Sequence, residues 1–573
     1  MAGAGAATAT VTASSVDTAT VTAADQLAIA PLLVALAAAI LTLALRRFRR
    51  LQVGASLLGG VGYLLAVAVL FEHVSAEGPI AYQLSAWPAP FGITAVADEL
   101  SVLMLALAAV VSLGALVFSV VYIAPADQRL SYHTLYHFMI VGVSGAFLTG
   151  DIFNLFVWFE VMLMASYVLV VFYSGPEQTR AALQYVVLNL IGSAVMLLAI
   201  GGIYATTGTL NMADLARRLA DPAAYGIAPE PVLGLSALLF AVFALKAGIV
   251  PFHFWVPAAY RAAPAPIAAV LAGVVKKVGI YAIVRLYFTV FGGMPVGPIP
   301  VVGGTGALAF YAPVFLALAG ASILLGGVLA VAQDDIDDLL AYSSVGQIGF
   351  VVLPLGIAAT VPVAGTPGSP VVTASAVEYF TRDLAVTAAL IYALHHGVAK
   401  SLLFLVSGAI QDAVGTTRLS DLGGLTEHVP VLSGTFFVGA LALVGVPPLF
   451  GFFGKFFVFD ALSNARATPA LAAAALAVAL LGAVLTIAYV TRAWNRGFWG
   501  EPGEAVGSPS PDRAQVAVLV GFAALVVALG IGVDPVIDAA RAGAEAALDR
   551  QGYVEAVDPQ LPGNATAATG GGE

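Results

Sequence analysis

The chain has 573 residues and a formal net charge of −10. Hydrophobic residues make up 60% and charged residues only 10%, against about 25% charged residues in an ordinary soluble domain. A soluble core cannot hold that many apolar side chains, so the composition predicts an integral membrane protein. The absence of cysteine excludes thiolate-held iron–sulfur clusters and disulfides. No cofactor, metal site or nucleic-acid partner is expected.

The first 24 residues are mainly Ala, Thr, Val and Ser. They lack the basic n-region of a cleaved signal, so a poorly ordered lead is expected there. The first apolar segment, 27–45, is therefore predicted to be a retained helix. The positive-inside rule places the basic cluster after it in the cytoplasm and the N-terminus outside. This cluster is Arg46, Arg47, Phe48, Arg49 and Arg50.

Apolar runs long enough to cross a ~30 Å hydrocarbon core recur along the chain. They predict an all-α polytopic membrane protein of about fourteen transmembrane helices. The spans are expected near 27–45, 54–71, 100–121, 134–149, 152–173, 184–206, 232–256, 266–291, 312–332, 339–359, 384–411, 431–461, 471–498 and 515–533. The polar stretches at 207–230 and 360–380 are expected to be extramembrane loops, and 501–513 a linker.

Prolines interrupt several apolar spans, notably at Pro251, Pro257 and the pair Pro447–Pro448. Proline removes a backbone donor, so the carbonyl groups that it frees must face protein or a wet cavity. Broken helices near the midplane are where transporters build ion sites. A kink with only a packing role is the alternative at each proline.

The chain has 18 arginines but only five lysines, and all five lie within or beside apolar segments. Burial disfavours the charged form of an ammonium group, so a buried lysine can release a proton, whereas a guanidinium remains protonated. Each buried charge costs about 2.5–3.5 kcal/mol on insertion scales. The lysines are therefore candidate proton-relay residues, with a static ion pair as the alternative. They are Lys246, Lys276, Lys277, Lys400 and Lys455.

Glu160 lies in the apolar segment from Asn154 to Met164. A buried carboxyl group there either stays protonated or has a cationic partner, and Lys246 is the expected partner. A pair whose separation changes with protonation can pass a proton between two halves of a channel. The spacing of the residues does not give the distance between the two groups.

Histidines add groups that titrate near neutral pH. His396 and Lys400 are four residues apart and share a helical stripe, and His395 adjoins them. His253 follows Lys246 by seven residues. A single buried histidine is more often a packed core residue, but the cluster around Lys400 favours a role in proton transfer.

Arg285 and Lys455 lie nearer the ends of their predicted spans, where snorkelling to the headgroups is expected and a transport role is the alternative. Asp98 and Asp151 lie at span entrances. They are interpreted either as vestibule acids or as helix caps.

Several long motifs resemble one known family. The segment Ala244–Pro257, continued by Ala263–Pro266 and Lys277–Tyr281, is similar to the signature of antiporter-like proton-translocating subunits. This family joins membrane subunits of respiratory complex I to the Mrp-type cation/proton antiporters. Supporting stretches are Phe156–Tyr167, Leu339–Ser344 with Gln347–Gly349, His395–Phe404 and Val446–Lys455, and the resemblance covers about 95–500.

The resemblance implies two inverted five-helix repeats, each with a broken helix, flanked by accessory helices. The expected division is a polar lead at 1–26, accessory helices at 27–122, a first repeat at 123–292, a second repeat at 293–462, accessory helices at 463–533 and a polar tail at 534–573.

The resemblance also implies roles for individual residues. Glu160 and Lys246 would form the coupled pair of one half-channel, Lys277 the central connecting lysine and Lys400 the terminal lysine of the other half. The sequence departs from the family at Asp337–Asp338, where a basic pair is usual. It departs again at Lys276, where threonine is common, so which of the two adjacent lysines faces the channel stays open.

Two functions remain open from the sequence. The stretch Trp87–Ile93 and the short chain favour the D-type subunit of a multisubunit Mrp Na⁺/H⁺ antiporter in the cell membrane. The alternative is a proton-pumping membrane subunit of an NADH-quinone oxidoreductase. In both cases the expected partners are other membrane subunits, the lipid bilayer, protons and monovalent cations, and no catalytic chemistry is expected in this chain.

Overall fold

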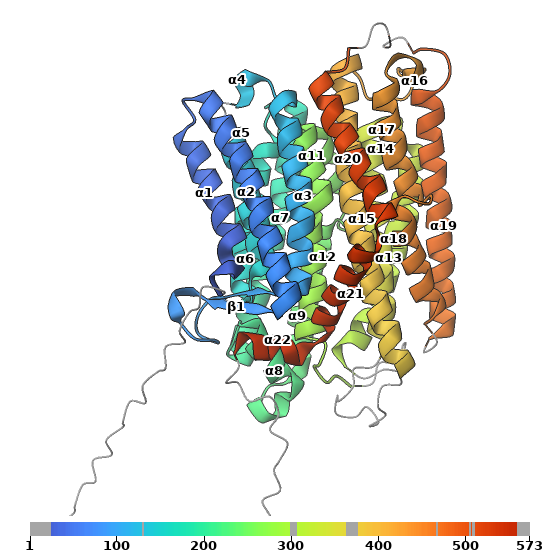
Figure 1. Cartoon of the computed structure of the whole chain (residues 1–573). Coiled ribbons are helices and arrows are strands. Elements are labelled where there is room, and N and C mark those ends of the chain that lie inside the picture. The colour runs from blue at the N-terminus through green and yellow to red at the C-terminus, as the bar shows by residue number, and fades with distance from the viewer. Residues whose placement is uncertain are drawn as a thin grey trace, which may run out of the picture.

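The structure is a computed structural model that describes residues 25–128, 131–297, 306–361, 376–465, 468–503, 506 and 510–558, with only the backbone at 376–380. The predicted lead at 1–24, most of the predicted loop at 360–380 and the end of the predicted tail lie outside the described residues. In the described part, nearly all regular structure is helical, as the composition predicted (Figure 1).

The N-terminal half forms one bundle of helices with a small two-stranded antiparallel sheet at its lower end in Figure 1. Its elements are η1 (Asp25–Ile29), α1 (Ala30–Ala44), α2 (Arg49–Glu77), β1 (Ile80–Gln83), η2 (Leu84–Ala86), β2 (Thr94–Ala97), α3 (Glu99–Tyr122), α4 (Pro125–Gln128), α5 (Tyr132–Leu148), α6 (Ile152–Val170), α7 (Pro176–Thr207), α8 (Met212–Ala220), η3 (Pro222–Tyr225), α9 (Pro229–Ala247), α10 (Trp255–Ala262), α11 (Ala265–Val270), η4 (Leu271–Val275), α12 (Lys276–Val284) and η5 (Arg285–Val290).

The C-terminal half packs beside it. Its elements are α13 (Ala307–Ala332), α14 (Ile336–Thr360), α15 (Ala376–Val414), α16 (Leu425–His428), α17 (Pro430–Val444), α18 (Phe450–Ser463), α19 (Pro469–Ala493), η6 (Trp494–Phe498), α20 (Arg513–Ile531), α21 (Asp534–Leu548) and α22 (Arg550–Val557). The segments η4, η5 and η6 are π-helical turns continuous with α-helices.

Within the described residues, twelve helices are long and apolar enough to cross a membrane. The predicted spans at 134–149 and 431–461 correspond to shorter helices, α5 with 17 residues and α17 with 15. The polytopic all-α prediction is therefore confirmed, and the expected number of about fourteen is compatible with the structure.

Two predicted spans are broken near a proline. The helix α9 ends at Gly248, whose φ is 67°, and the chain passes Pro251 before α10 begins. The helix α17 ends in the same way at Gly445, with φ 91°, and Pro447 and Pro448 precede α18. Glycine reaches a positive φ without steric cost, and proline prevents the helix from continuing. These breaks confirm the predicted broken helices.

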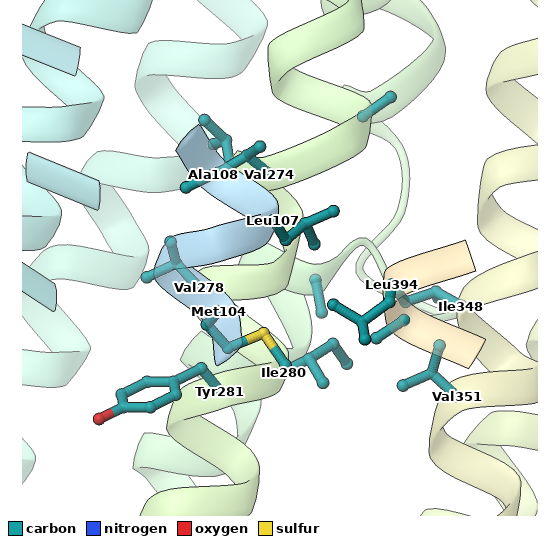
Figure 2. Close-up of a cluster of buried hydrophobic side chains, with 14 of the residues drawn as sticks. Met104, Leu107, Ala108, Val274, Val278, Ile280, Tyr281, Ile348, Val351 and Leu394 are labelled. Carbon is teal, nitrogen blue, oxygen red and sulfur yellow. The ribbon is translucent and has the colours of Figure 1, made fainter. Parts of the chain in front are cut away.

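Three spans form the interior of the bundle: the continuous segment 265–290, α14 and the part of α15 from Thr381 onward. Their most apolar windows are between 94% and 100% buried, against 28% for α2. Figure 2 shows apolar side chains of α3, α12, α14 and α15 meeting in this interior, among them Leu107, Val278 and Ile348. These three spans therefore bring an apolar packing layer to the centre of the bundle.

Residues 534–557 were predicted to begin a polar tail, but they form α21 and α22. The helix α21 packs on α3 and α15, and α22 packs on α8 at the lower end of the bundle (Figure 1). Small residues allow this contact, because Ala540, Gly543 and Ala544 lie on the buried face of α21.

Two glycines of α13 make a matched test of helix packing. A Cβ on Gly326 would lie 2.4 Å from the main-chain nitrogen of Gly346 on α14, whereas one on Gly320 would meet nothing closer than 3.7 Å. We expect Gly326→Ala to lower the stability of the detergent-solubilised protein by roughly 1–3 kcal/mol, because backbone cannot move aside. Gly320→Ala should leave the melting temperature unchanged or slightly higher. Equal melting temperatures would contradict this close α13–α14 contact.

Candidate functional site

All five lysines are buried, with between 0% and 5% of each residue exposed. They come from four separate helices: Lys246 from α9, Lys276 and Lys277 from α12, Lys400 from α15 and Lys455 from α18. No ion pair to any of them is found among the described residues. Neutral oxygen and nitrogen atoms solvate these side chains instead.

Lys246 does not form the expected ion pair with Glu160. Its Nζ donates to the Tyr185 hydroxyl at 3.2 Å and lies 5.6 Å from the centre of that ring. The Glu160 carboxylate accepts a hydrogen bond from Ser193 and is half-buried rather than fully buried. Part of α6 faces the outside of the bundle, since its residue Met164 is exposed. Each member of the pair is thus held by a neutral hydroxyl group.

Two of the five buried lysines, Lys276 and Lys277, lie in one group with His396, which is the centre of the row that the five lysines form. Lys277 Nζ lies 2.6 Å from His396 Nδ1, and Lys276 Nζ donates to the Ser344 carbonyl at 3.1 Å. The Ser344 hydroxyl lies 3.4 Å from His396 Nε2 and 3.4 Å from Lys276 Nζ. Both adjacent lysines therefore belong to one hydrogen-bonded group.

Lys276 also connects this centre to the break after α9. A Cβ on Gly248 would lie 3.3 Å from Lys276 Nζ, so the ammonium group sits against the break, two residues after Lys246. His253 lies in the same break, buried and stacked on Phe254 at 4.6 Å. Its Nδ1 atom has no hydrogen-bond partner among the described residues.

Lys400 starts a second polar group that the sequence did not reveal. Its Nζ donates to the Leu340 carbonyl and to the Ser343 hydroxyl, both at 2.8 Å. Ser343 donates to the Tyr489 hydroxyl at 2.7 Å, and Gln347 donates to the same hydroxyl at 3.0 Å. The predicted i, i+4 stripe of His396 and Lys400 on α15 therefore points toward α12 and α14.

The polar group continues to the second broken helix. Tyr392 donates to the Gln347 side chain, and its ring stacks on Phe350 at 5.3 Å and meets His395 edge-on at 5.6 Å. Both ring nitrogens of His395 lack a partner among the described residues. Lys455 Nζ lies 5.6 Å from the centre of the Phe350 ring. The row thus extends from α6 to α18.

The prediction that Lys455 snorkels toward the headgroups was wrong, because the residue is 5% exposed. Its Nζ donates to the Val444 carbonyl at 2.9 Å. In a continuous helix that carbonyl would accept from residue 448, which is proline and has no N–H. The sequence shows that Pro448 lies four residues after Val444. A carbonyl group left without its usual helical donor in this way is the signal that could have located Lys455.

The same prediction for Arg285 was wrong as well. Arg285 is 1% exposed and forms a buried ion pair with Asp98, at 2.5 Å from Nη2 to Oδ2. Its guanidinium group also lies 4.7 Å from the centre of the Tyr553 ring on α22. Arg285 is buried because Asp98 and Tyr553 cover it, and Tyr553 lies in the segment that the sequence predicted to be a polar tail.

The acids at the span entrances act as helix caps. Asp98 accepts from the Ser101 amide at 2.9 Å at the start of α3, and Asp151 accepts from the Asn154 amide at 2.7 Å at the start of α6. Asp98 also lines a cavity of about 500 Å³ with Glu99 and Glu545. The helix-cap interpretation of Asp98 is therefore confirmed, and the vestibule interpretation stays a prediction.

Known proteins match this chain along most of its length. The family described as "NADH:quinone oxidoreductase/Mrp antiporter, TM" matches residues 149–365 and 374–482. The D-type subunit of the Na(+)/H(+) antiporter from Alkalihalophilus pseudofirmus is 35% identical over 87% of this chain and 92% of its own. The N-type subunit of the NADH-quinone oxidoreductase from Desulforudis audaxviator is also 35% identical, over 75% of this chain and 78% of its own.

Solved structures of two complexes contain chains that superpose on most of this chain. A chain of the Mrp complex from Dietzia sp. DQ12-45-1b superposes with a TM-score of 0.79 at 27% identity and covers 94% of this chain and all of its own. A chain of respiratory complex I from Thermus thermophilus gives 0.71 at 22% identity, over 92% of this chain and 99% of its own, and shows the same fold. The fold and the buried lysines define a polytopic membrane protein of the antiporter-like class. The chain belongs to the NADH:quinone oxidoreductase/Mrp antiporter family.

The buried ion pair gives a test of how this site is stabilised. We expect Asp98→Asn to destabilise the detergent-solubilised protein by about 3–5 kcal/mol, because it leaves the Arg285 charge buried without a partner. The double variant Asp98→Asn with Arg285→Met should recover part of that loss. Melting curves of the two variants beside wild type measure the difference. A double variant less stable than Asp98→Asn would contradict a role for charge pairing.

Proposed function

We propose that this chain is a membrane subunit of a multisubunit monovalent-cation (Na⁺)/proton antiporter, and that it moves protons along its row of buried lysines. The observation that carries the proposal is the set of buried, titratable side chains on Lys246, Lys276, Lys277, Lys400 and Lys455, none of which forms an ion pair with a carboxylate among the described residues. An ammonium group held by neutral acceptors can give up its proton, whereas one in a tight ion pair is held in the charged form.

Glu160 and Lys246 supply the coupling step of this proposal. Ser193 and Tyr185 keep the two groups apart while both can gain or lose a proton. A proton arriving at Glu160 removes its negative charge and with it the attraction that favours the ammonium form of Lys246. The lysine then releases its proton toward Lys276, whose ammonium group lies at the break after α9.

The remaining groups continue the path. His396 bridges Lys277 and Ser344 through its two ring nitrogens, so one imidazole can accept a proton on one side and donate on the other. Lys400 and Lys455 continue the path toward α18, with His395 between them. The membrane potential supplies about 2.3 kcal/mol per charge per 100 mV, so this chain needs no redox chemistry of its own.

The proposed setting is the cell membrane, with other membrane subunits as partners. The turn between α1 and α2 carries Arg46, Arg47, Arg49 and Arg50, and by the positive-inside rule it faces the cytoplasm. The upper end of the bundle in Figure 1 is then cytoplasmic and the N-terminus lies outside. Several large apolar side chains of α7 are exposed, including Leu190 and Leu198, where lipid or a neighbouring protein of the complex would cover them.

The second candidate is a proton-pumping membrane subunit of an NADH-quinone oxidoreductase. It is retained because the relative from Desulforudis audaxviator is as similar in identity as the antiporter relative. The antiporter relative is matched over more of both chains, which favours the first candidate.

The test is cation-driven proton movement in everted vesicles that contain the whole native complex. We expect added Na⁺ to collapse a preset pH gradient in wild type. Lys246→Ala and Glu160→Gln should each slow this at least about tenfold, as expected when a positioned proton-transfer group is lost. If Na⁺ has no effect but NADH builds a gradient that the variants lose, the oxidoreductase candidate holds instead.

Lys246→Arg separates a proton relay from a static charge. A guanidinium group keeps the positive charge but does not release its proton. We expect Lys246→Arg to be as inactive as Lys246→Ala while the complex remains assembled in the membrane. Arg180→Ala, at an exposed site on α7, serves as the matched control and should behave as wild type. Full activity of Lys246→Arg would contradict the relay.

A further inference from the structure

The turn between α1 and α2 carries the densest positive charge of the chain. Arg46, Arg47, Arg49 and Arg50 follow one another closely, and residues 26–71 contain no aspartate or glutamate. None of these arginines forms an ion pair among the described residues. The turn therefore holds a cluster of positive charges without a direct counter-charge from the described part of the chain.

Hydrogen bonds hold the main chain of this turn in place. The Phe48 amide donates to the Leu45 carbonyl at 2.8 Å. Arg49 donates to the side chain of Gln128 at 3.4 Å, which joins the turn to α4. Asp127 precedes Gln128, but it forms no ion pair among the described residues. The other arginines of the cluster are exposed, so a fixed turn presents their guanidinium groups to the surroundings.

An apolar strip begins beside the arginines and continues along α2. Phe48, at the start of the helix, is 62% exposed, and Leu51 and Leu58 are exposed further along. Gly54 lies between the two leucines, and a Cβ on Gly54 would meet nothing within 4 Å. These positions follow one another at spacings of three or four residues, so they share one face of α2. The strip that they form is therefore apolar, open and continuous with the charged turn.

The strip lies on the outer edge of the bundle. The helices α1 and α2 form this edge in Figure 1, and both are long and apolar enough to cross a membrane. Only 33% and 28% of their most apolar windows are buried. In a bilayer, the arginines would meet the headgroups and the strip would meet the hydrocarbon chains.

The start of α2 adds main-chain donors to the arginines. No side chain among the described residues caps this helix, which has 29 residues. The first N–H groups of a helix have no acceptor within it, and this end of the helix dipole attracts anions. Guanidinium groups bind phosphate oxygens through two parallel hydrogen bonds. The chemistry of the turn therefore fits a phosphate group.

We infer that the turn between α1 and α2 is a binding site for the phosphate of an anionic phospholipid in the cytoplasmic leaflet. The exposed arginines contact the phosphate, and an acyl chain lies along the strip from Phe48 to Leu58. A zwitterionic headgroup carries the same phosphate but adds a cation that the arginines repel. A free anion would leave the apolar strip unused. The inference does not depend on the proposed transport function, because bound lipid is detected directly.

The test places a photoreactive side chain in the strip. Leu51→p-benzoyl-phenylalanine is introduced into this chain, and the purified whole complex is reconstituted into vesicles of equal parts phosphatidylglycerol and phosphatidylcholine. After illumination, mass spectrometry identifies the lipids crosslinked to this chain. We expect at least about fivefold more capture of phosphatidylglycerol than of phosphatidylcholine, which is about the factor that one arginine near an anionic surface contributes.

Val328→p-benzoyl-phenylalanine is the matched control of position. Val328 is exposed on α13, as Leu51 is on α2. It lies shortly before Asp334, which pairs with Arg492 and Arg496, so the arginines at this site have a counter-charge. Arg496 belongs to η6, which packs on α16 at the upper end in Figure 1, so Val328 faces the same leaflet. We expect nearly equal capture of the two lipids at this position.

A charge variant tests the source of the preference. Arg46→Gln combined with Arg47→Gln should lower the ratio of phosphatidylglycerol to phosphatidylcholine captured at Leu51 several-fold. Both arginines are exposed, so the complex should remain assembled. Arg180→Gln combined with Arg513→Gln removes the same charge from exposed sites on α7 and α20 and should leave the ratio unchanged.

Inorganic phosphate separates a lipid site from a site for a free anion. Excess phosphate should reduce the preference no more than sodium chloride of the same ionic strength does. If phosphate removes the preference and chloride does not, the turn binds a free anion and the lipid site is wrong. Equal capture of the two lipids at Leu51, or an unchanged ratio in the variant of Arg46 and Arg47, would each overturn the inference. Capture of a peptide from another subunit instead of a lipid would show that the turn is a protein contact.

Discussion

The structure depends on solvating ammonium groups inside a membrane-spanning bundle. A charge buried in the bilayer costs about 2.5–3.5 kcal/mol on insertion scales, and an unpaired one is retained only where polar atoms face it. Four of the five lysines donate to a main-chain carbonyl, and the fifth donates to a tyrosine hydroxyl. Carbonyl oxygens stabilise the ammonium group, but they carry no full negative charge and so do not hold the lysine in its protonated form. This property suits a group that must change its protonation state.

Irregular helical structure supplies part of that solvation. The Val444 carbonyl is free for Lys455 because residue 448 is a proline, and Lys277 donates to Ala272 within the π-helical turn η4. Gly248, at the break after α9, leaves the space that Lys276 occupies. Each of these three departures from regular helix thus lies next to a lysine. Apolar side chains of α3, α12, α14 and α15 pack together in the same interior (Figure 2).

Much of the architecture was predictable from residue patterns. Apolar runs predicted the spans, and prolines predicted the two broken helices. Both features are set by residues that are neighbours in the sequence. The positions of Lys455 and Arg285 were predicted wrongly, because their burial depends on distant segments: α18 packs on α15, and Asp98 and Tyr553 cover Arg285. The Glu160–Lys246 ion pair was also expected, but Ser193 and Tyr185 come from α7, and their approach depends on how that helix packs.

The sequence by itself determined the membrane class, the family resemblance and the set of lysines. Each of these features depends on the type of residue at a position and not on the residues that pack against it. Only the tertiary structure decided which groups meet. Lys277 and His396 are 119 residues apart, and Lys400 and Ser343 are 57 apart, yet both pairs are in contact. Such contacts arise from the packing of whole helices, which no single segment specifies.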